Sequence, residues 1–443
     1  MTDSLKIQPA KAFDLTLAPP GSKSLTNRAL LLAALADGES KLSGVLLADD
    51  TRRMLEALDQ LGFKLDVDES AHTVTVHGQG GKIPAKKADL NLGNAGTAMR
   101  FLTGALVLGH GTYTLDGIPR MRERPIGELV DPLRELGASI DYLGEAGYPP
   151  LQINATGDFG GGMVRLEPTL SSQFISSLLM TGPCSERGIT VAFEGAITSL
   201  PYIKMSLKLM EYFGADSAWG GPGGRAVRVQ PGGYRPRDYT IEPDASNASY
   251  FLAAAAVVPG SSCTIQHLGS ESVQGDAEFC DVLGLMGCDV TQWMNTTTVS
   301  APKNGQLNGI DIRLHRMPDM AQTLAVIALF ADGPTTIRKV GNLRVKETDR
   351  LAALDTELTK LGAEVRVKGD TIRIHPPPGN DLNAAAVDTY DDHRMAMSFA
   401  VAGLASMPGS EITINDPDCV NKTYPTFWDD VQKLHDAALE PAN

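Results

Sequence analysis

Six short stretches of the sequence combine basic, acidic and hydroxyl side chains at spacings that could bind and activate an anion. They are PGSKSLTNR, LGNAGTAMR, RMRERP, SSQF, NLRVKETDR and YDDHR. Each stands at the start of a predicted helix, where unpaired backbone N–H groups and the helix dipole favour negative charge. Lys23 and Arg28 are disfavoured there unless an anion binds beside them. The sequence therefore predicts a polyanion site built from helix N-termini, Lys and Arg.

The glycine patterns narrow the kind of anion. The sequence has no G-x-x-x-x-G-K-[ST] loop and no G-x-G-x-x-G fingerprint after a predicted strand, so nucleotide sites of those types are not indicated. The glycine turn at residues 93–97 allows backbone to approach a ligand closely. Small phosphorylated carboxylic acids are therefore the favoured ligands.

Composition excludes several other classes of protein. The 443 residues carry a formal net charge of −14, which argues against nucleic acid as the main partner. The longest apolar runs are too short to cross a bilayer, and the N-terminus has no secretory pattern, so we expect a cytoplasmic protein. Five scattered cysteines lack zinc-type spacing and predict neither disulfides nor a metal site.

The elements that must position these residues repeat six times. Apolar segments begin near Ser24, Gly96, Ser172, Ser246, Asp319 and Asp392 and stop at glycine, which predicts buried helices. Ser24 is the expected cap of the first, and Gly38 its expected end. Amphipathic segments lie between them, and five of these end at Gly62, Gly137, Gly214, Gly287 and Gly362. Each unit reads as strand, buried helix, strand, amphipathic helix and two-stranded hairpin.

Six such units predict an α/β protein with three units in each of two domains. The glycine- and proline-rich stretch 220–236 favours a boundary near residue 241. We expect one domain at residues 22–241 and a discontinuous second domain at 1–21 with 242–443. The stretch 220–236 itself suggests no function.

Together, the quoted motifs resemble the 5-enolpyruvylshikimate-3-phosphate synthase family of enolpyruvyl transferases, in order and over essentially the whole chain. The resemblance implies a two-domain inverted α/β barrel of six β-α-β-α-β-β units, with the substrates between the domains. It implies transfer of the enolpyruvyl group of phosphoenolpyruvate to the 5-hydroxyl of shikimate 3-phosphate, releasing phosphate through a tetrahedral intermediate. It implies no metal, no organic cofactor and a monomer.

Matching motifs also imply the residues of the site. Those for shikimate 3-phosphate are Lys23, Ser24, Arg28, Ser171, Ser172, Gln173, Ser199, Tyr202, Asp319, Asn342 and Lys346. Those for phosphoenolpyruvate are Lys23, Asn94, Gly96, Arg124, Gln173, Glu347, Arg350, Arg394 and Lys422. The implied catalytic residues are Asp319, which deprotonates the 5-hydroxyl, and Glu347 with Lys23, which handle the methylene proton. The division of proton transfer among these three stays open.

One position departs from the family pattern. Phe101 stands where many bacterial members carry proline, which bears on sensitivity to glyphosate, the family's inhibitor at the phosphoenolpyruvate site. We expect an enzyme that is sensitive or moderately sensitive to glyphosate.

Two alternative functions have less support from the sequence. The sister transferase for UDP-N-acetylglucosamine carries a cysteine before its RP motif, and GIPRMRERP has none. A ring-shaped nucleic-acid clamp needs cations along its inner helices, and here they are confined to helix ends.

Overall fold

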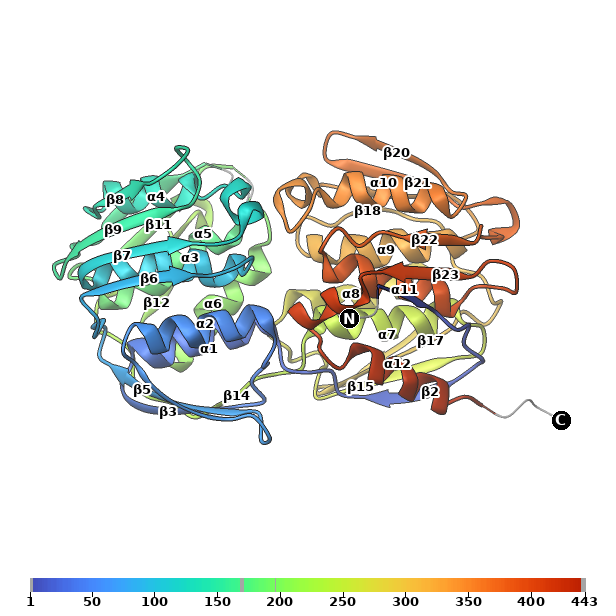
Figure 1. Cartoon of the computed structure of the whole chain (residues 1–443), viewed down its shortest axis with the longest axis horizontal. Helices are drawn as coiled ribbons and strands as arrows, with labels where there is room; N and C mark the ends of the chain where they lie inside the picture. The colour runs from blue at the N-terminus through green and yellow to red at the C-terminus, as the bar shows by residue number, and fades with distance from the viewer. Residues whose placement is uncertain (1–2, 168–170, 196, 440–443) are drawn as a thin grey trace. The chain divides into compact units, whose positions relative to one another are not determined.

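The structure is a computed structural model that describes residues 3–167, 171–195 and 197–439. By its internal contacts the chain divides into two units (Figure 1). The N-terminal unit is Gly21–Glu242, and the C-terminal unit combines Met1–Pro20 with Pro243–Asn443. In each unit, sheets lie around a group of central helices.

The N-terminal unit contains three buried and three amphipathic helices. The buried ones are α1 (Lys23–Leu35), α3 (Gly96–Ala105) and α5 (Ser172–Thr181). The amphipathic ones are α2 (Asp49–Gln60), α4 (Gly127–Glu135) and α6 (Leu200–Tyr212). The buried helices approach closely, because a Cβ atom at Gly104 of α3 would lie 2.3 Å from Ser177 Oγ of α5.

Three four-stranded sheets complete this unit, and in each the first two strands are parallel and the others antiparallel. The first sheet has the order β14 (Tyr239–Thr240), β3 (Asp37–Ser43), β5 (Thr73–Gln79), β4 (Lys64–Asp68). The second has β6 (Lys87–Asn91), β7 (His110–Asp116), β9 (Leu151–Thr156), β8 (Ile140–Tyr142). The third has β10 (Gly162–Leu166), β11 (Ile189–Phe193), β13 (Ala226–Val229), β12 (Ser217–Gly220).

The C-terminal unit follows the same plan. Its buried helices are α7 (Ala245–Val257), α9 (Ala321–Ile327) and α11 (His393–Leu404), and its outer helices are α8 (Phe279–Leu285), α10 (Arg350–Lys360) and α12 (Phe427–Asp436). Two sheets have the orders β16 (Asp289–Gln292), β17 (Thr296–Ser300), β15 (Ser262–Gln266), β2 (Asp14–Leu17) and β18 (Asp311–Arg313), β19 (Thr335–Arg338), β21 (Thr371–His375), β20 (Glu364–Lys368). The third has three strands, β1 (Ser4–Lys6), β23 (Ile412–Asn415) and β22 (Ala385–Val387).

Strands that are distant in sequence from their partners complete several of these sheets. In the C-terminal unit, β2 pairs in parallel with β15, and β1 pairs with β23 in the place that a hairpin strand takes in the other sheets. In the N-terminal unit, β14 supplies the parallel partner of β3. The predicted repeat of strand, helix, strand, helix and hairpin is therefore confirmed, with β1 replacing the hairpin of the last repeat.

The predicted glycine ends of the amphipathic helices are confirmed, whereas the predicted cap and end of the first buried helix are not. All five glycines that follow the amphipathic helices adopt positive φ, between 86° and 102°, as a left-handed C-terminal cap requires. The prediction that Ser24 caps α1 is wrong, because the Ser22 side chain accepts the N–H of Leu25 and the helix begins at Lys23. Gly38 does not end this helix either. The helix stops at Leu35, and Gly38 lies in β3 with φ 130°.

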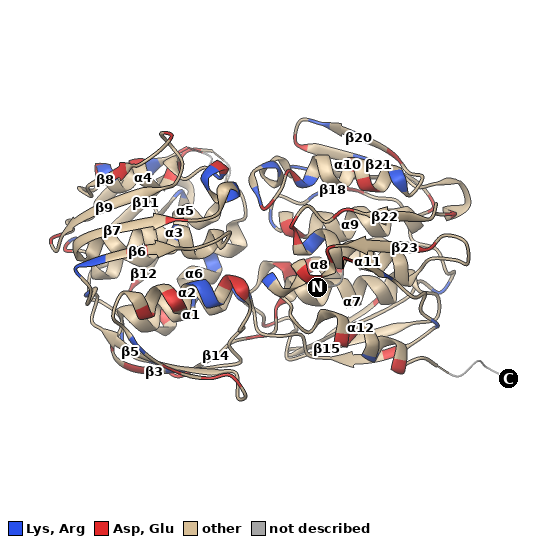
Figure 2. Ribbon diagram, viewed as in Figure 1, with Lys and Arg blue, Asp and Glu red and all other residues tan. Residues whose placement is uncertain are grey.

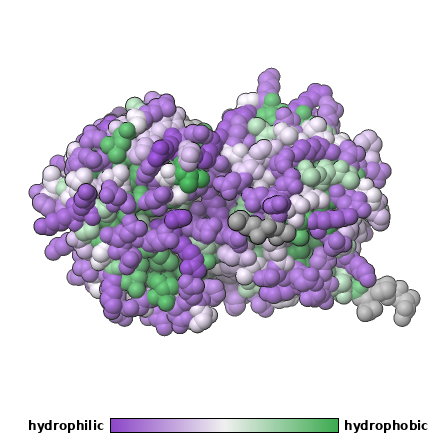
Figure 3. Space-filling model, viewed as in Figure 1, coloured by the Kyte–Doolittle hydropathy of each residue, from purple (hydrophilic) through white to green (hydrophobic). Residues whose placement is uncertain are grey.

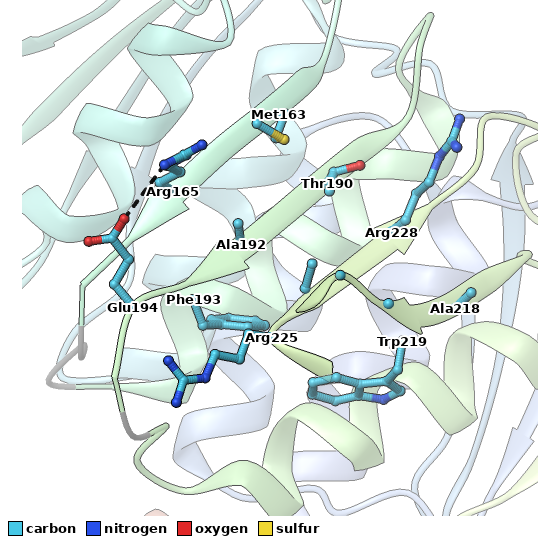
Figure 4. A pocket seen from close by; sticks show the side chains of 13 residues that line it. Met163, Arg165, Thr190, Ala192, Phe193, Glu194, Ala218, Trp219, Arg225 and Arg228 are labelled. Carbon is cyan, nitrogen blue, oxygen red and sulfur yellow. Dashed lines mark ion pairs between the residues drawn. The ribbon is translucent and has the colours of Figure 1, made fainter. Parts of the chain in front are cut away.

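The stretch 220–236, whose composition suggested a linker, is partly sheet. It includes β13, which pairs with both β11 and β12. Across the sheet, the register aligns Arg165, Ala192, Ala226 and Gly220, so three adjacent positions carry small side chains. A shallow cavity of about 540 Å³ lies over this row, with Trp219 at one end (Figure 4). None of the predicted site residues lines it.

The surface is mixed in character. Figure 3 shows a mainly hydrophilic face with separate apolar patches. Among the residues that the structure describes, no helix combines the length and apolarity needed to cross a membrane.

Candidate active site

In the C-terminal unit, the predicted site residues gather around one buried guanidinium group. Arg350, the first residue of α10, is 1% exposed. Its Nη1 lies 3.0 Å from Asp319 Oδ1, its Nη2 lies 2.9 Å from Glu347 Oε2, and its Nε lies 2.7 Å from Asp392 Oδ2. These three carboxylates come from the turn before α9, the turn before α10 and the cap of α11. Two consecutive repeats, the fifth and the sixth, therefore contribute to one ionic cluster.

The cations of the cluster outnumber its carboxylates. Lys346 Nζ and Arg394 Nη2 each lie 3.5 Å from Asp319, and Lys422 Nζ lies 3.7 Å from Glu347 Oε1. With Arg350 this makes four cations against three carboxylates, counting Asp392. Buried charges need such compensation because desolvation is costly. Clustered Lys and Arg side chains of this kind suit an anionic ligand.

The two predicted acid–base residues lie in this cluster. Burial opposes ionisation of Asp319, but Lys346, Arg394 and Arg350 together hold its pKa well below its usual value. Burial lowers the pKa of Arg350, and Asp392, Glu347 and Asp319 outweigh it and raise that pKa. Asp319 is therefore ionised near neutral pH and available to accept a proton.

The other predicted residues of this unit lie on neighbouring elements. Arg394 is the second residue of α11, and its Nη1 donates to the hydroxyl of Tyr250 at 3.3 Å. Lys422 ends the 3₁₀ turn Pro417–Lys422, and Asn342 lies in the 3₁₀ turn Gly341–Val345, where it is 9% exposed.

In the N-terminal unit, Arg28 joins three helices. Its Nε donates to Ser206 Oγ of α6 at 2.7 Å, its Nη1 to the Ser24 carbonyl at 2.9 Å, and its Nη2 to Ser176 Oγ of α5 at 3.3 Å. Its guanidinium lies 4.9 Å from the centre of the Phe101 ring on α3. Burial lowers the pKa of Arg28 to about 10, so it remains a cation. Arg28 thus joins α1 to the interior of α5 and α6 through buried hydrogen bonds.

Ser24 and Tyr202 belong to the same region. Ser24 offers its carbonyl oxygen to Arg28, and the Tyr202 carbonyl lies 3.5 Å from Arg28 Nη2. Ser199 precedes α6 with φ 56°, an unusual left-handed conformation for a residue with a side chain.

A second group in this unit forms around Gly96. Arg124 Nη1 donates to the backbone and side-chain oxygens of Asn94 at 3.1 and 3.0 Å. A Cβ atom at Gly96 would lie 2.5 Å from Arg124 Nη2. Glycine is therefore needed here so that the arginine can lie against the first turn of α3.

The start of α5 joins this group through one hydrogen bond. Gln173 Nε2 donates to Thr97 Oγ1 of α3 at 3.1 Å. Ser171 caps α5, and its Oγ accepts the N–H of Gln173. Ser172, the first residue of the helix, is 5% exposed. The beginnings of α3 and α5 thus lie together, as their equivalent places in the repeat predict.

Two carboxylates that bind predicted site residues were not themselves predicted as site residues. Asp50 Oδ2 lies 3.2 Å from Lys23 Nζ, and Asp392 binds Arg350. Each is the second aspartate of an acidic pair at a helix start, ADD at α2 and YDD at α11. Only the second of these helix starts belongs to the motifs from which the anion site was predicted. The charge on the helix α2 is visible in Figure 2, where acidic and basic segments adjoin.

Three arginines at these helix starts have structural partners. Arg120 and Arg122 form ion pairs with Glu123 and Asp116, and Arg100 donates to the carbonyls of Gly96 and Pro125. These three arginines therefore bind oxygen atoms of the protein itself. Among the described residues, no group of three or more His, Cys, Asp or Glu is arranged to hold a metal ion.

Comparison with known proteins shows the family to which the chain belongs. The profile of the family described as EPSP synthase (3-phosphoshikimate 1-carboxyvinyltransferase) matches residues 7–431. A 3-phosphoshikimate 1-carboxyvinyltransferase from Marinomonas sp. (strain MWYL1) is 46% identical over 96% of this chain and 98% of that protein. One from Yersinia pseudotuberculosis (serotype O:3, strain YPIII) is 48% identical over 99% of this chain and 100% of that protein.

Solved structures show the same fold. The EPSP synthase of Acinetobacter baumannii superposes with a TM-score of 0.79 at 26% identity, over 98% of both chains. The enolpyruvyl transferase NikO from Streptomyces tendae, at 20% identity, superposes with a TM-score of 0.74 over 97% of both chains and so shares the fold. The expected enolpyruvyl transferase fold is confirmed. From its sequence, its fold and its full-length relatives, this chain belongs to the EPSP synthase family, the 3-phosphoshikimate 1-carboxyvinyltransferases.

Proposed function

We propose that the Lys and Arg side chains at the helix starts of this chain bind phosphoenolpyruvate and shikimate 3-phosphate. The enzyme is a transferase of the shikimate pathway, which serves aromatic amino-acid biosynthesis, and moves the enolpyruvyl group between these substrates. The observation that supports our proposal most strongly is the Arg350 cluster, in which four cations face three carboxylates. Two phosphates and two carboxylates must approach one another in this reaction, which requires such positive charge.

Each ligand has its own set of residues in the proposal. Arg124, Arg350, Arg394 and Lys422 hold phosphoenolpyruvate, and Asn94 and Gly96 form its backbone wall. Ser24, Arg28, Ser171, Ser172, Ser199, Tyr202, Asn342 and Lys346 hold shikimate 3-phosphate. Lys23 and Gln173 contact both substrates.

The two domains in this proposal are residues 22–241 and residues 1–21 with 242–443.

The proton transfers follow from the charges around each carboxylate. Ionised Asp319 accepts the proton of the 5-hydroxyl as its oxygen bonds to C2 of phosphoenolpyruvate, and a proton from Glu347 or Lys23 reaches the methylene carbon. The tetrahedral intermediate then loses phosphate while a base removes a proton from the methyl group that was formed, which restores the double bond. The cations around Asp319 lower its pKa and so keep the carboxylate ionised, as a base must be, although they also reduce its strength as a base.

Three finer features complete the proposal. Glyphosate binds at the phosphoenolpyruvate site. Its inhibition constant, measured by steady-state competition against phosphoenolpyruvate, is expected to be of the same order of magnitude as the KM for phosphoenolpyruvate or lower. The enzyme acts as a monomer. It acts in the cytoplasm.

Coupled phosphate release tests the proposed function directly. The wild-type protein is expected to release phosphate only when shikimate 3-phosphate and phosphoenolpyruvate are both present. UDP-N-acetylglucosamine in place of shikimate 3-phosphate is expected to give none. Absence of release with the first pair of substrates would refute the proposal, and release with the nucleotide sugar would move the protein to the sister activity.

Phe101→Leu is expected to raise the KM for shikimate 3-phosphate roughly two- to fivefold, because it removes a cation–π contact with Arg28. The kcat changes little, since Arg28 keeps its hydrogen bonds. Steady-state kinetics with either substrate varied measure the effect. Phe213→Leu is the control, since Phe213 is equally buried in the same unit and, within the described part of the chain, no arginine lies over its ring. An unchanged KM in Phe101→Leu would contradict this role.

A further inference from the structure

The connection between β22 and α11 (residues 388–392) has an unusual backbone. Tyr390 and Asp391 adopt φ of 56° and 54°, so two adjacent residues with side chains are left-handed. Such conformations persist where the surrounding structure holds them. The next residue is Asp392, which caps α11 and binds Arg350. Whatever holds this connection therefore also places a partner of the site.

A buried carboxylate holds the connection at its other end. Glu357 of α10 is fully buried. Its Oε1 accepts the Tyr390 hydroxyl at 2.6 Å, and its Oε2 accepts the Asp388 N–H at 3.2 Å. Hydrogen bonds to an ionised carboxylate are stronger than neutral ones. Burial, followed by the bond to Glu357, raises the pKa of Tyr390 to about 12, so the hydroxyl remains a donor.

A lysine completes this arrangement. Lys360 Nζ lies 2.8 Å from Glu357 Oε2 and 2.8 Å from Asp388 Oδ2. Asp388 Oδ1 also accepts from Asn415 Nδ2 of β23 at 2.7 Å. The Glu357 charge is thus compensated, and Asp388 is held by both α10 and the neighbouring strand.

The same helix holds the connection at a second point. Arg350 and Glu357 are seven residues apart on α10, which places them on one face two turns apart. At the first turn, Arg350 makes bonds of 2.7 and 3.2 Å to the two oxygens of Asp392. Two turns further along α10, Glu357 accepts the hydrogen bond from the Tyr390 hydroxyl. Movement of residues 388–391 would therefore be transmitted to Asp392 and, through it, to the Arg350 guanidinium.

We propose that Glu357 and Tyr390 are positioning residues, which hold the left-handed connection so that Asp392 orients Arg350 toward phosphoenolpyruvate. This inference rests on the proposed function, in which Arg350 holds that substrate. Neither residue touches substrate. Their effect passes through Asp392, so it falls on the binding of phosphoenolpyruvate rather than on the proton transfers.

Tyr390→Phe tests the proposal by removing one hydroxyl. We expect the KM for phosphoenolpyruvate to rise roughly five- to tenfold, as for loss of one bond to a charged group, while kcat stays within about twofold. Glu357→Gln should give the same pattern. Tyr113→Phe is the control, since it removes a buried hydroxyl bond to the Ala85 carbonyl in the other unit. An unchanged KM for phosphoenolpyruvate, or a fall confined to kcat, would overturn the proposal.

A double-mutant cycle separates positioning from general destabilisation. If Tyr390 acts through Asp392, the combined loss in kcat/KM from Tyr390→Phe and Asp392→Asn is smaller than the product of the single losses. Multiplicative losses would overturn the proposal. Arg350→Lys takes the place of Asp392→Asn in the cycle if that variant does not fold.

Amide hydrogen exchange gives a readout that does not depend on activity. Tyr390→Phe is expected to increase exchange at residues 389–395 relative to wild type, with no increase in the N-terminal unit. Unchanged exchange at these residues would overturn the proposal. If wild type releases no phosphate but the exchange increases, the proposed function fails and the structural coupling stands, so the two failures are distinguishable.

Discussion

Glu347→Gln is expected to lower kcat by roughly two to four orders of magnitude, which is the usual contribution of a positioned acid–base group. Glu347 is 8% exposed and lies between Arg350 and Lys422, at 2.9 and 3.7 Å. Glutamine keeps the size of the side chain but cannot donate or accept the methylene proton. It also removes one negative charge from the cluster, so the KM for phosphoenolpyruvate should not rise. Phosphate release at saturating concentrations of both substrates measures kcat.

The control for Glu347→Gln is a carboxylate of the same unit outside the site. Asp311 forms a two-point ion pair with Arg338, at 2.7 and 2.6 Å, on the exposed sheet β18–β19. Asp311→Asn should leave kcat unchanged. If Glu347→Gln retains near-normal turnover, the methylene proton is handled by another group, and Lys23 is the next residue to replace.

Gly96→Ala is expected to raise the KM for phosphoenolpyruvate roughly ten- to a hundredfold with much of kcat retained. The added Cβ would lie 2.5 Å from Arg124 Nη2 and 2.8 Å from its Cζ. Arg124 is 4% exposed and bonded twice to Asn94, so it cannot move away without losing those bonds. The methyl group also occupies the space beside the first turn of α3. The inhibition constant for glyphosate should rise at least as much as KM.

Gly220→Ala is the matched control in the same unit, because no atom lies within 4 Å of a Cβ at that position. It should leave both constants unchanged. If Gly96→Ala leaves the KM for phosphoenolpyruvate and the glyphosate constant unchanged, then α3 does not form the wall of the phosphoenolpyruvate site. A higher KM in Gly220→Ala would mean that the assay reports general destabilisation.

Much of the fold could be predicted because its signals are local. The positive φ of Gly62 and Gly362 follows from glycine at the end of an amphipathic segment, since only glycine adopts that conformation at little cost. Ends that depend on more distant contacts were predicted less well. Ser22 and Ser24 are both good capping residues, and the choice between them depends on where the chain enters the unit, through the bond from Ser22 N–H to the Glu242 carbonyl.

The site was predictable in its residue types but not in their pairing. Basic residues at helix starts in an acidic chain indicate an anion site without any contact being known. Arg100 and Arg122 carry the same signal and yet bind the protein itself. The distinction depends on which oxygen atoms come within reach, and those belong to Pro125 and Asp116.

Residue order alone was enough to specify six repeats, their helices and strands, and the charge gathered at the helix starts, because periodicity, capping and turn chemistry act over a few neighbouring residues. The folded chain was needed to show that Asp319 and Asp392 share Arg350, that Phe101 lies against Arg28, and that β1 and β2 join strands late in the sequence. These contacts join residues far apart along the chain. Burial and charge compensation in the packed protein select them, and no short segment contains that information.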